Sequence, residues 1–176
     1  RLVSDWSSDV CSSDLKRGYY IAAQEYIEYS LVLSKAVNDR PRIVSMSMSL
    51  AYVHMALNQM SQAAKRICEG LQLAHEIGAT PREVELVVCA GRWLLISGEA
   101  EEAARFAAMA AAHPTMIKDV VNERLAPLQA DLAQILGEQA MTVASVRGAS
   151  LTLEQALGEV QARLCASLPQ EPDHGF

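Results

Sequence analysis

Apolar residues recur three and four positions apart between Gly18 and Pro114, which places them along one face of a helix. Turn-forming residues divide this pattern into segments of similar length. Two segments begin at a proline and read PRIVSMSMSLAYVHMAL and PREVELVVCAGRWLLIS. A turn and a second helical segment follow each of them, NQMSQAAKRICEGLQLAHEIG and GEAEEAARFAAMAAAHP. The pattern therefore predicts an all-α chain of helical hairpins without a sheet.

The hairpins repeat with a period of about forty residues, and such a repeat is typical of a stacked solenoid. Residues forty apart match in many places: Ala23, Ala63 and Ala103; Gly18, Asn58 and Gly98; Pro41 and Pro81; Val44 and Val84; Ile27 and Ile67; Leu31 and Leu71. We expect Gly18, Asn58 and Gly98 to occupy equivalent turns. Small residues, Ala51 or Gly91 on the first helix and Ala63 or Ala103 on the second, predict where paired helices approach closely.

The helix ends carry local signals. Thr80, Pro81 and Glu83 predict a capping box at the start of one helix, and Thr152 with Gln155 predicts another. After Pro114 the repeat register weakens. We expect one helix from Thr115 to Leu136, bent at Pro127, then a short helix ending at Gly148 and a last helix. Because a solenoid must cover its last apolar face, this segment is interpreted as a C-terminal helical cap.

These hairpins resemble tetratricopeptide repeats, in the long form found in maltose-regulator-like proteins. The resemblance covers Gly18 to Pro114, although the usual Trp is missing and His54 or Leu94 stands where Tyr is common. It implies a right-handed superhelix. The chain then divides into a leader (1–15), repeats (16–114), a helical cap (115–168) and a disordered tail (169–176).

The C-terminal part resembles the end of large bacterial regulators, the LuxR and maltose-regulator signal-transduction ATPases. The residues that carry this resemblance are His113-Pro114, Leu136-Gly137-Glu138, Arg147-Gly148 and Leu151 to Ala156. It implies that the chain is the C-terminal sensor region of a longer transcription regulator. The sequence contains no Gly-rich phosphate loop, so the ATPase domain of that family is not part of this sequence.

The first fifteen residues differ from the rest. Asp5 to Leu15 read DWSSDVCSSDL and resemble a translated sequencing-library adapter, whereas the alternative is a natural Ser/Asp-rich linker. One period before Ala51 lies Cys11, so this segment occupies the place of a first helix. We assign it no function and expect it to pack poorly. We then expect partial solvent exposure of Tyr19, Ile27 and Leu31. The chain should self-associate through this edge.

Composition excludes several function classes. The net charge is −6, which argues against nucleic-acid binding because phosphate contacts require clustered Lys and Arg. No apolar run is long enough for a membrane helix. The cysteines are isolated, which fits the reducing cytoplasm: Cys11, Cys68, Cys89 and Cys165. No two histidines have metal-ligand spacing, and no nucleophile or acid–base pair is recognisable. We therefore predict no catalytic residue, no metal and no cofactor.

The expected function is non-catalytic binding of a protein, a peptide or a small effector. Helical spacing of three and four predicts one groove stripe on successive first helices: Ser45, Met48, Tyr52, Met55, Glu85, Val88, Arg92 and Leu95. The alternative is structural, with Arg92 paired to an acid and Tyr52 sealing a packed groove. The methionines Met46, Met48, Met55 and Met60 form either part of a binding face or part of the core. A free-standing adaptor and a helical enzyme are the other functional hypotheses.

Overall fold

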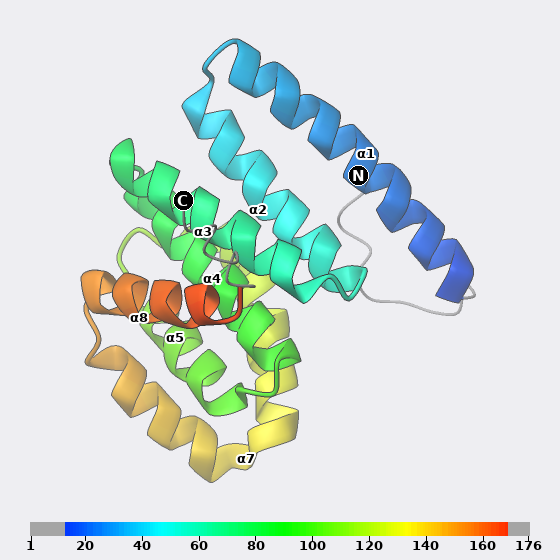
Figure 1. Ribbon diagram of the computed structural model, residues 1–176. Helices are drawn as coiled ribbons and strands as arrows, with labels where there is room; N and C mark the ends of the chain where they lie inside the picture. The colour runs from blue at the N-terminus through cyan, green and yellow to red at the C-terminus, as the bar shows by residue number, and fades with distance from the viewer. Residues whose placement is uncertain (1–12, 169–176) are drawn as a thin grey trace, which may run out of the picture.

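The structure is a computed structural model that describes residues 13–168. Every regular element in this range is helical: α1 (Ser13–Ala36), α2 (Arg40–Ala56), α3 (Met60–Glu76), α4 (Thr80–Ile96), α5 (Ala100–Ala112), α6 (Lys118–Val120), the π-helical segment η1 (Val121–Leu125), α7 (Ala126–Ala149) and α8 (Leu153–Ala166). The all-α prediction is confirmed for this range. Consecutive helices pack as antiparallel hairpins (Figure 1).

The turns between the first five helices recur every twenty residues. Asn38, Asn58, Gly78 and Gly98 each follow a helix and have a positive φ, between 54° and 88°. Only Gly, and less readily Asn, adopts this left-handed conformation at low cost, so these residues end the helices. The forty-residue repeat of the sequence is thus two such units. The prediction for Gly18 was wrong, because it lies inside α1 and not in a turn.

One of the two predicted capping boxes is found, and a third helix has a side-chain cap that was not predicted. Asp39 caps α2 by accepting a hydrogen bond from the Arg42 amide at 3.2 Å. At α4 the predicted capping box is absent, since Ala79 is the cap residue and Glu83 instead bonds His75 Nδ1 at 3.0 Å. At α8 the predicted box is confirmed, with Thr152 and Gln155 joined by reciprocal bonds.

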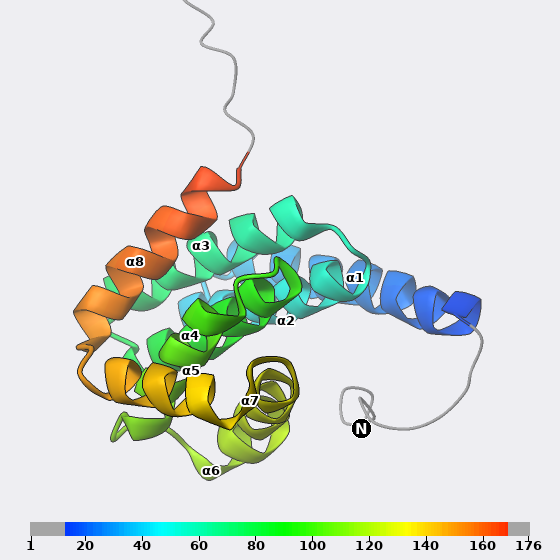
Figure 2. The ribbon, with the colours of Figure 1, turned by 90° about the horizontal axis from the view of Figure 1, so that it is seen from below.

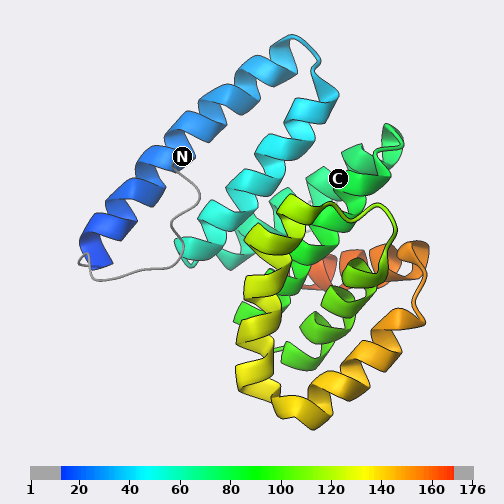
Figure 3. The same ribbon diagram turned by 180° about the vertical axis from the view of Figure 1, so that it is seen from behind.

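The segment after Pro114 forms a bent first arm, a second arm and a last helix, in the order that the sequence predicted. The first arm runs from Lys118 through η1 into α7, and the π-turn lies directly before Pro127, whose missing N–H interrupts the regular hydrogen bonding. Gly137 has φ 76° and ψ 172° and breaks α7. Figure 3 shows the two arms of α7 meeting at this bend.

The core runs between the hairpins from α2 to α8, with α4 at its centre. Every residue of α4 from Glu83 to Gly91 is buried. Gly91 confirms the predicted close approach: a Cβ there would meet Leu128 Cδ2 at 3.1 Å and the Ala103 carbonyl oxygen at 3.6 Å. Small side chains therefore let α4 lie close to both α5 and α7.

The last helix, α8, crosses α3, α4 and α5 (Figure 2). Ion pairs hold it to α5: Arg105 contacts both Glu102 and Glu159, and Arg163 contacts both Glu99 and Glu102. The guanidinium of Arg105 holds the pKa of the Glu159 carboxyl below its usual range. Because Arg105 is nearly buried, this network fixes α8 more firmly than a fully exposed pair would.

The predicted leader (1–15) and tail (169–176) fall mainly outside the described range. Helix α1 begins at Ser13, so three residues of the leader are helical, and the rest of that prediction lies outside residues 13–168. Within residues 13–168, no helix is long and apolar enough to cross a membrane.

Candidate functional site

The eight residues of the predicted groove stripe lie on α2 and α4, as expected, but the stripe is not open. Met48, Met55, Glu85 and Val88 are buried. The other four are partly buried: Ser45, Tyr52, Arg92 and Leu95. An open peptide groove would leave most of these side chains accessible, so other parts of the chain must cover them.

Tyr52 is covered by the π-helical segment. The guanidinium carbon of Arg124 lies 4.8 Å from the centre of the Tyr52 ring, which is cation–π geometry. Burial raises the pKa of the Tyr52 hydroxyl above its ordinary value. It also raises the pKa of the neighbouring Cys89 thiol to about 12. Tyr52, Cys89 and Arg124 thus form one packed contact between α2, α4 and η1.

The first arm of α7 covers Arg92. The Arg92 guanidinium forms an ion pair with Asp131, and Leu128 packs against Gly91 one residue away. Asp131 and Leu128 lie on the same arm. Two residues of the stripe, Tyr52 and Arg92, thus contact the η1–α7 arm, as the structural alternative describes.

The methionine run divides between the core and its edge. Met48 and Met55 are buried in the core, whereas Met46 and Met60 are partly buried. The indole N–H of Trp93 donates a hydrogen bond to the Met60 carbonyl oxygen at 3.0 Å, so Met60 is also held at a helix junction. These side chains do not gather into one accessible face.

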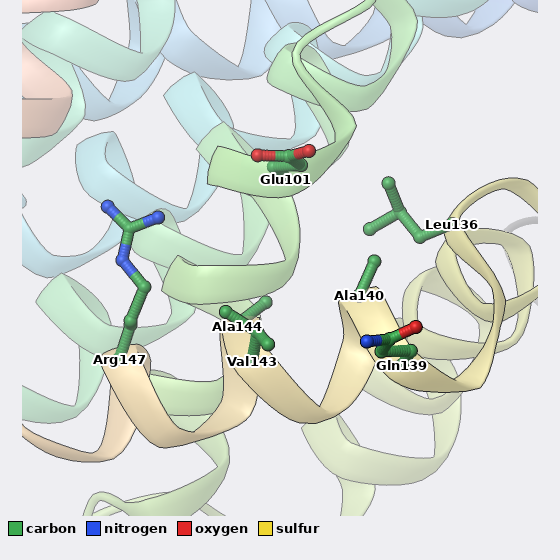
Figure 4. Close-up of a pocket in the computed structure, with 7 residues that line it drawn as sticks. All are labelled: Glu101, Leu136, Gln139, Ala140, Val143, Ala144 and Arg147. Atoms are coloured by element: carbon green, nitrogen blue, oxygen red, sulfur yellow. The ribbon is translucent and has the colours of Figure 1, made fainter.

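An accessible cavity of about 380 Å³ lies between α5 and the second arm of α7. It is lined by Glu101, Leu136, Gln139, Ala140, Val143, Ala144 and Arg147. Figure 4 shows the α7 side chains in a row from Arg147 at one end to Leu136 and Gln139 at the other, with Glu101 of α5 above them. An apolar floor flanked by an acid and a base suits a ligand that combines an apolar body with polar ends.

A second hollow, of about 290 Å³, lies where α5 ends and α8 begins. His113, Pro114, Gly148 and Leu151 line it, and these residues belong to the C-terminal motif pieces seen in the sequence. The His113 ring bonds the Thr115 hydroxyl at 2.9 Å, which fixes the chain leaving α5. These motif pieces therefore meet at the junction between α5, α7 and α8, where they have a structural role.

Sequence reasoning missed the cavity between α5 and α7. Its residues are ordinary helix residues that come from two distant segments, and Gly137 must turn the chain before they meet. A signal was present, because a glycine followed by an apolar helix repeats the pattern at Gly98. The helix boundary at this glycine was predicted, but the repeat register did not relate it to Gly98, which it follows by 39 residues and not by forty.

Two of the cysteines predicted to be isolated are neighbours. Burial and the adjacent Cys165 thiol of α8 raise the pKa of Cys68 on α3 to about 12. Both are free thiols, as is the buried Cys89. Among residues 13–168, no group of three His, Cys, Asp or Glu side chains is placed to hold a metal ion.

Comparison with known proteins adds no relative: no family model, no curated protein and no solved structure matches the chain.

Proposed function

We propose that the protein is a non-catalytic binding scaffold of tetratricopeptide-like helical hairpins, and that its ligand site is the cavity between α5 and α7. The observation that carries this proposal is the cavity itself, which combines apolar Val143 and Ala140 with flanking Glu101 and Arg147. Its partner is a peptide or small effector with an apolar body and polar ends.

The arrangement of the helices supports this function. Short turns at twenty-residue spacing join the helices of the stack, and the ion pairs of Arg105 and Arg163 hold α8 against α5. A rigid stack can present one cavity with little loss of conformational entropy on binding. The cavity lies at the C-terminal end of the stack, where the second arm of α7 packs against α5.

The test is a binding screen with matched variants. Purified protein is screened against a library of short peptides and small amphipathic effectors by fluorescence polarisation. Ala140→Glu, which places a longer acidic side chain in the cavity, and Arg147→Glu, which reverses its cation, are each expected to weaken binding at least tenfold. Val146→Glu is the control, because Val146 is exposed on the same arm and does not line the cavity. Equal affinity in all four proteins would reject the cavity as the site.

The biological setting is a second part of the proposal. We propose that the chain is the C-terminal sensor region of a multidomain bacterial signalling ATPase or transcription regulator, on the strength of the motif pieces around His113 and Gly148. The genomic reading frame upstream tests it. A nucleotide-binding domain encoded there would support the regulator, whereas a nearby start codon preceded by a stop would favour a free-standing adaptor.

A further inference from the structure

Helix α1 packs against α2 on one side, and among residues 13–168 nothing covers the large apolar side chains on its other side. Ser30, Leu31 and Ser34 are buried on the side that packs against α2. The other side exposes a run of large apolar side chains: Tyr19, Ile21, Tyr26, Tyr29, Val32, Leu33 and Val37. Figure 1 shows α1 at the edge of the molecule, with α2 on one side.

The exposed face is not needed for the hairpin repeat. Forty residues later, on α3, the positions of Tyr26, Tyr29 and Val32 are taken by Arg66, Glu69 and Gln72. Helix α3 packs against α2 from its other side without apolar residues at these places. At these three positions the apolar character is therefore particular to α1, which indicates a contact that α3 does not make.

The exposed area is large enough for a specific interface. Tyr19, Tyr26 and Tyr29 are 63%, 71% and 64% exposed. At about 200 Å² for each tyrosine side chain, they alone present roughly 400 Å² of aromatic surface. The four aliphatic side chains bring the face close to the ~800 Å² per partner that a stable complex buries. From Gly18 to Val37, the exposed residues include two charges, Glu25 and Lys35.

The spacing of this face is that of a helix–helix seam, and a second α1 helix fits it. Six exposed residues follow alternating steps of three and four, the pattern of a helix–helix seam: Tyr19, Ala22, Tyr26, Tyr29, Leu33 and Ala36. When two copies of this seam run antiparallel, Tyr19 faces Ala36, Ala22 faces Leu33 and Tyr26 faces Tyr29. Each large side chain then meets a small one, or a tyrosine meets a tyrosine near the two-fold axis.

We propose that the protein forms a homodimer in which the α1 helices of two copies pair antiparallel through this seam. The two-fold arrangement uses the same face twice, as closed dimers do. Aromatic pairs between Tyr26 and Tyr29 of the two copies occupy its centre. The proposal is independent of the ligand cavity, which lies at the other end of the hairpin stack.

The first test measures the mass of the full chain by sedimentation equilibrium across micromolar concentrations. The wild type is expected to sediment as a dimer. Tyr26→Glu with Tyr29→Glu should weaken dimerisation by at least about 30-fold, because these tyrosines occupy the centre of the interface. Lys35→Glu is the matched control: it lies on α1 outside the seam and should leave the dimer intact. Circular dichroism checks that each variant stays helical.

The second test reads the direction of pairing. A chain carrying both Ala22→Cys and Leu33→Cys is oxidised mildly, and its disulfide-linked peptides are identified by mass spectrometry. Antiparallel pairing predicts links from residue 22 of one copy to residue 33 of the other. Links that join residue 22 to residue 22 would show parallel helices and overturn the proposed seam. A monomeric wild type at every concentration, or a double Glu variant that dimerises as the wild type does, would overturn the homodimer.

Discussion

Gly148 stands where the second arm of α7 meets α5 most closely. A Cβ at this position would lie 2.2 Å from the Arg105 carbonyl oxygen and 2.7 Å from the Ala108 Cβ, both far inside contact distance. The backbone of α5 cannot yield without disturbing the helix. The arm therefore depends on the absence of a side chain at this one residue.

Gly148→Ala is accordingly expected to destabilise the protein by about 2–3 kcal/mol, the cost of overpacking a close contact. Gly158→Ala is the matched control, since a Cβ at Gly158 meets nothing within 4 Å. That change should instead stabilise helix α8 by up to about 1 kcal/mol. Urea denaturation followed by circular dichroism measures both. An unchanged midpoint for Gly148→Ala would mean that α7 and α5 do not approach as closely as described.

Single residues were predictable from the sequence where the signal is local. The capping box of Thr152 and Gln155 depends on four consecutive residues, and it forms as expected. Glu83 shows the limit of such signals. The same local pattern precedes α4, but the nearby His75 provides another partner for the carboxylate, 3.0 Å away. A sequence pattern does not show which partner a side chain will choose once two helices meet.

At the scale of helices, the turn residues carry most of the information. The apolar spacing predicted the hairpins between Pro41 and Pro114, because each turn has a Gly or Asn in the left-handed conformation. The forty-residue register wrongly predicted a turn at Gly18. Identical residues forty positions apart do not show whether a glycine ends a helix or lies within one. The helix boundary next to Gly137 was predicted, because the helical pattern ends at Leu136 and starts again after the glycine.

Gly18 and Gly98 therefore should respond in opposite directions to the same substitution. Gly98 has φ 88°, where a side chain costs roughly 1–2 kcal/mol, so Gly98→Ala should lower the free energy of unfolding. Gly18 lies in α1 with nothing within 4 Å of an added Cβ, so Gly18→Ala should raise it by up to about 1 kcal/mol. Chemical denaturation of the two variants measures the difference. Equal losses would place Gly18 in a turn after all.

At the scale of the whole molecule, the stripe on α2 and α4 shows what the sequence could not provide. Helical spacing placed Tyr52 and Arg92 correctly on one stripe, but it could not tell which surface the stripe would meet. That depends on the η1–α7 arm, whose Arg124 and Asp131 come from about forty to seventy residues further along the chain. The cavity is likewise formed by segments that the repeat register did not connect.

The contacts of this arm lead to an expectation that separates a packed interface from an open groove. Tyr52→Ala should lower the stability by about 3 kcal/mol, because it removes a buried aromatic ring from beneath Arg124. Arg92→Glu should lower the free energy of unfolding by less, about 1 kcal/mol, because it places a second acid beside Asp131. Adding Asp131→Arg to Arg92→Glu restores an ion pair and should recover part of that loss, which a double-mutant cycle of thermal unfolding measures. In an open groove neither Tyr52 nor Arg92 would hold the η1–α7 arm in place. Tyr52→Ala would then leave the melting temperature unchanged, and the effects of Arg92→Glu and Asp131→Arg on stability would simply add.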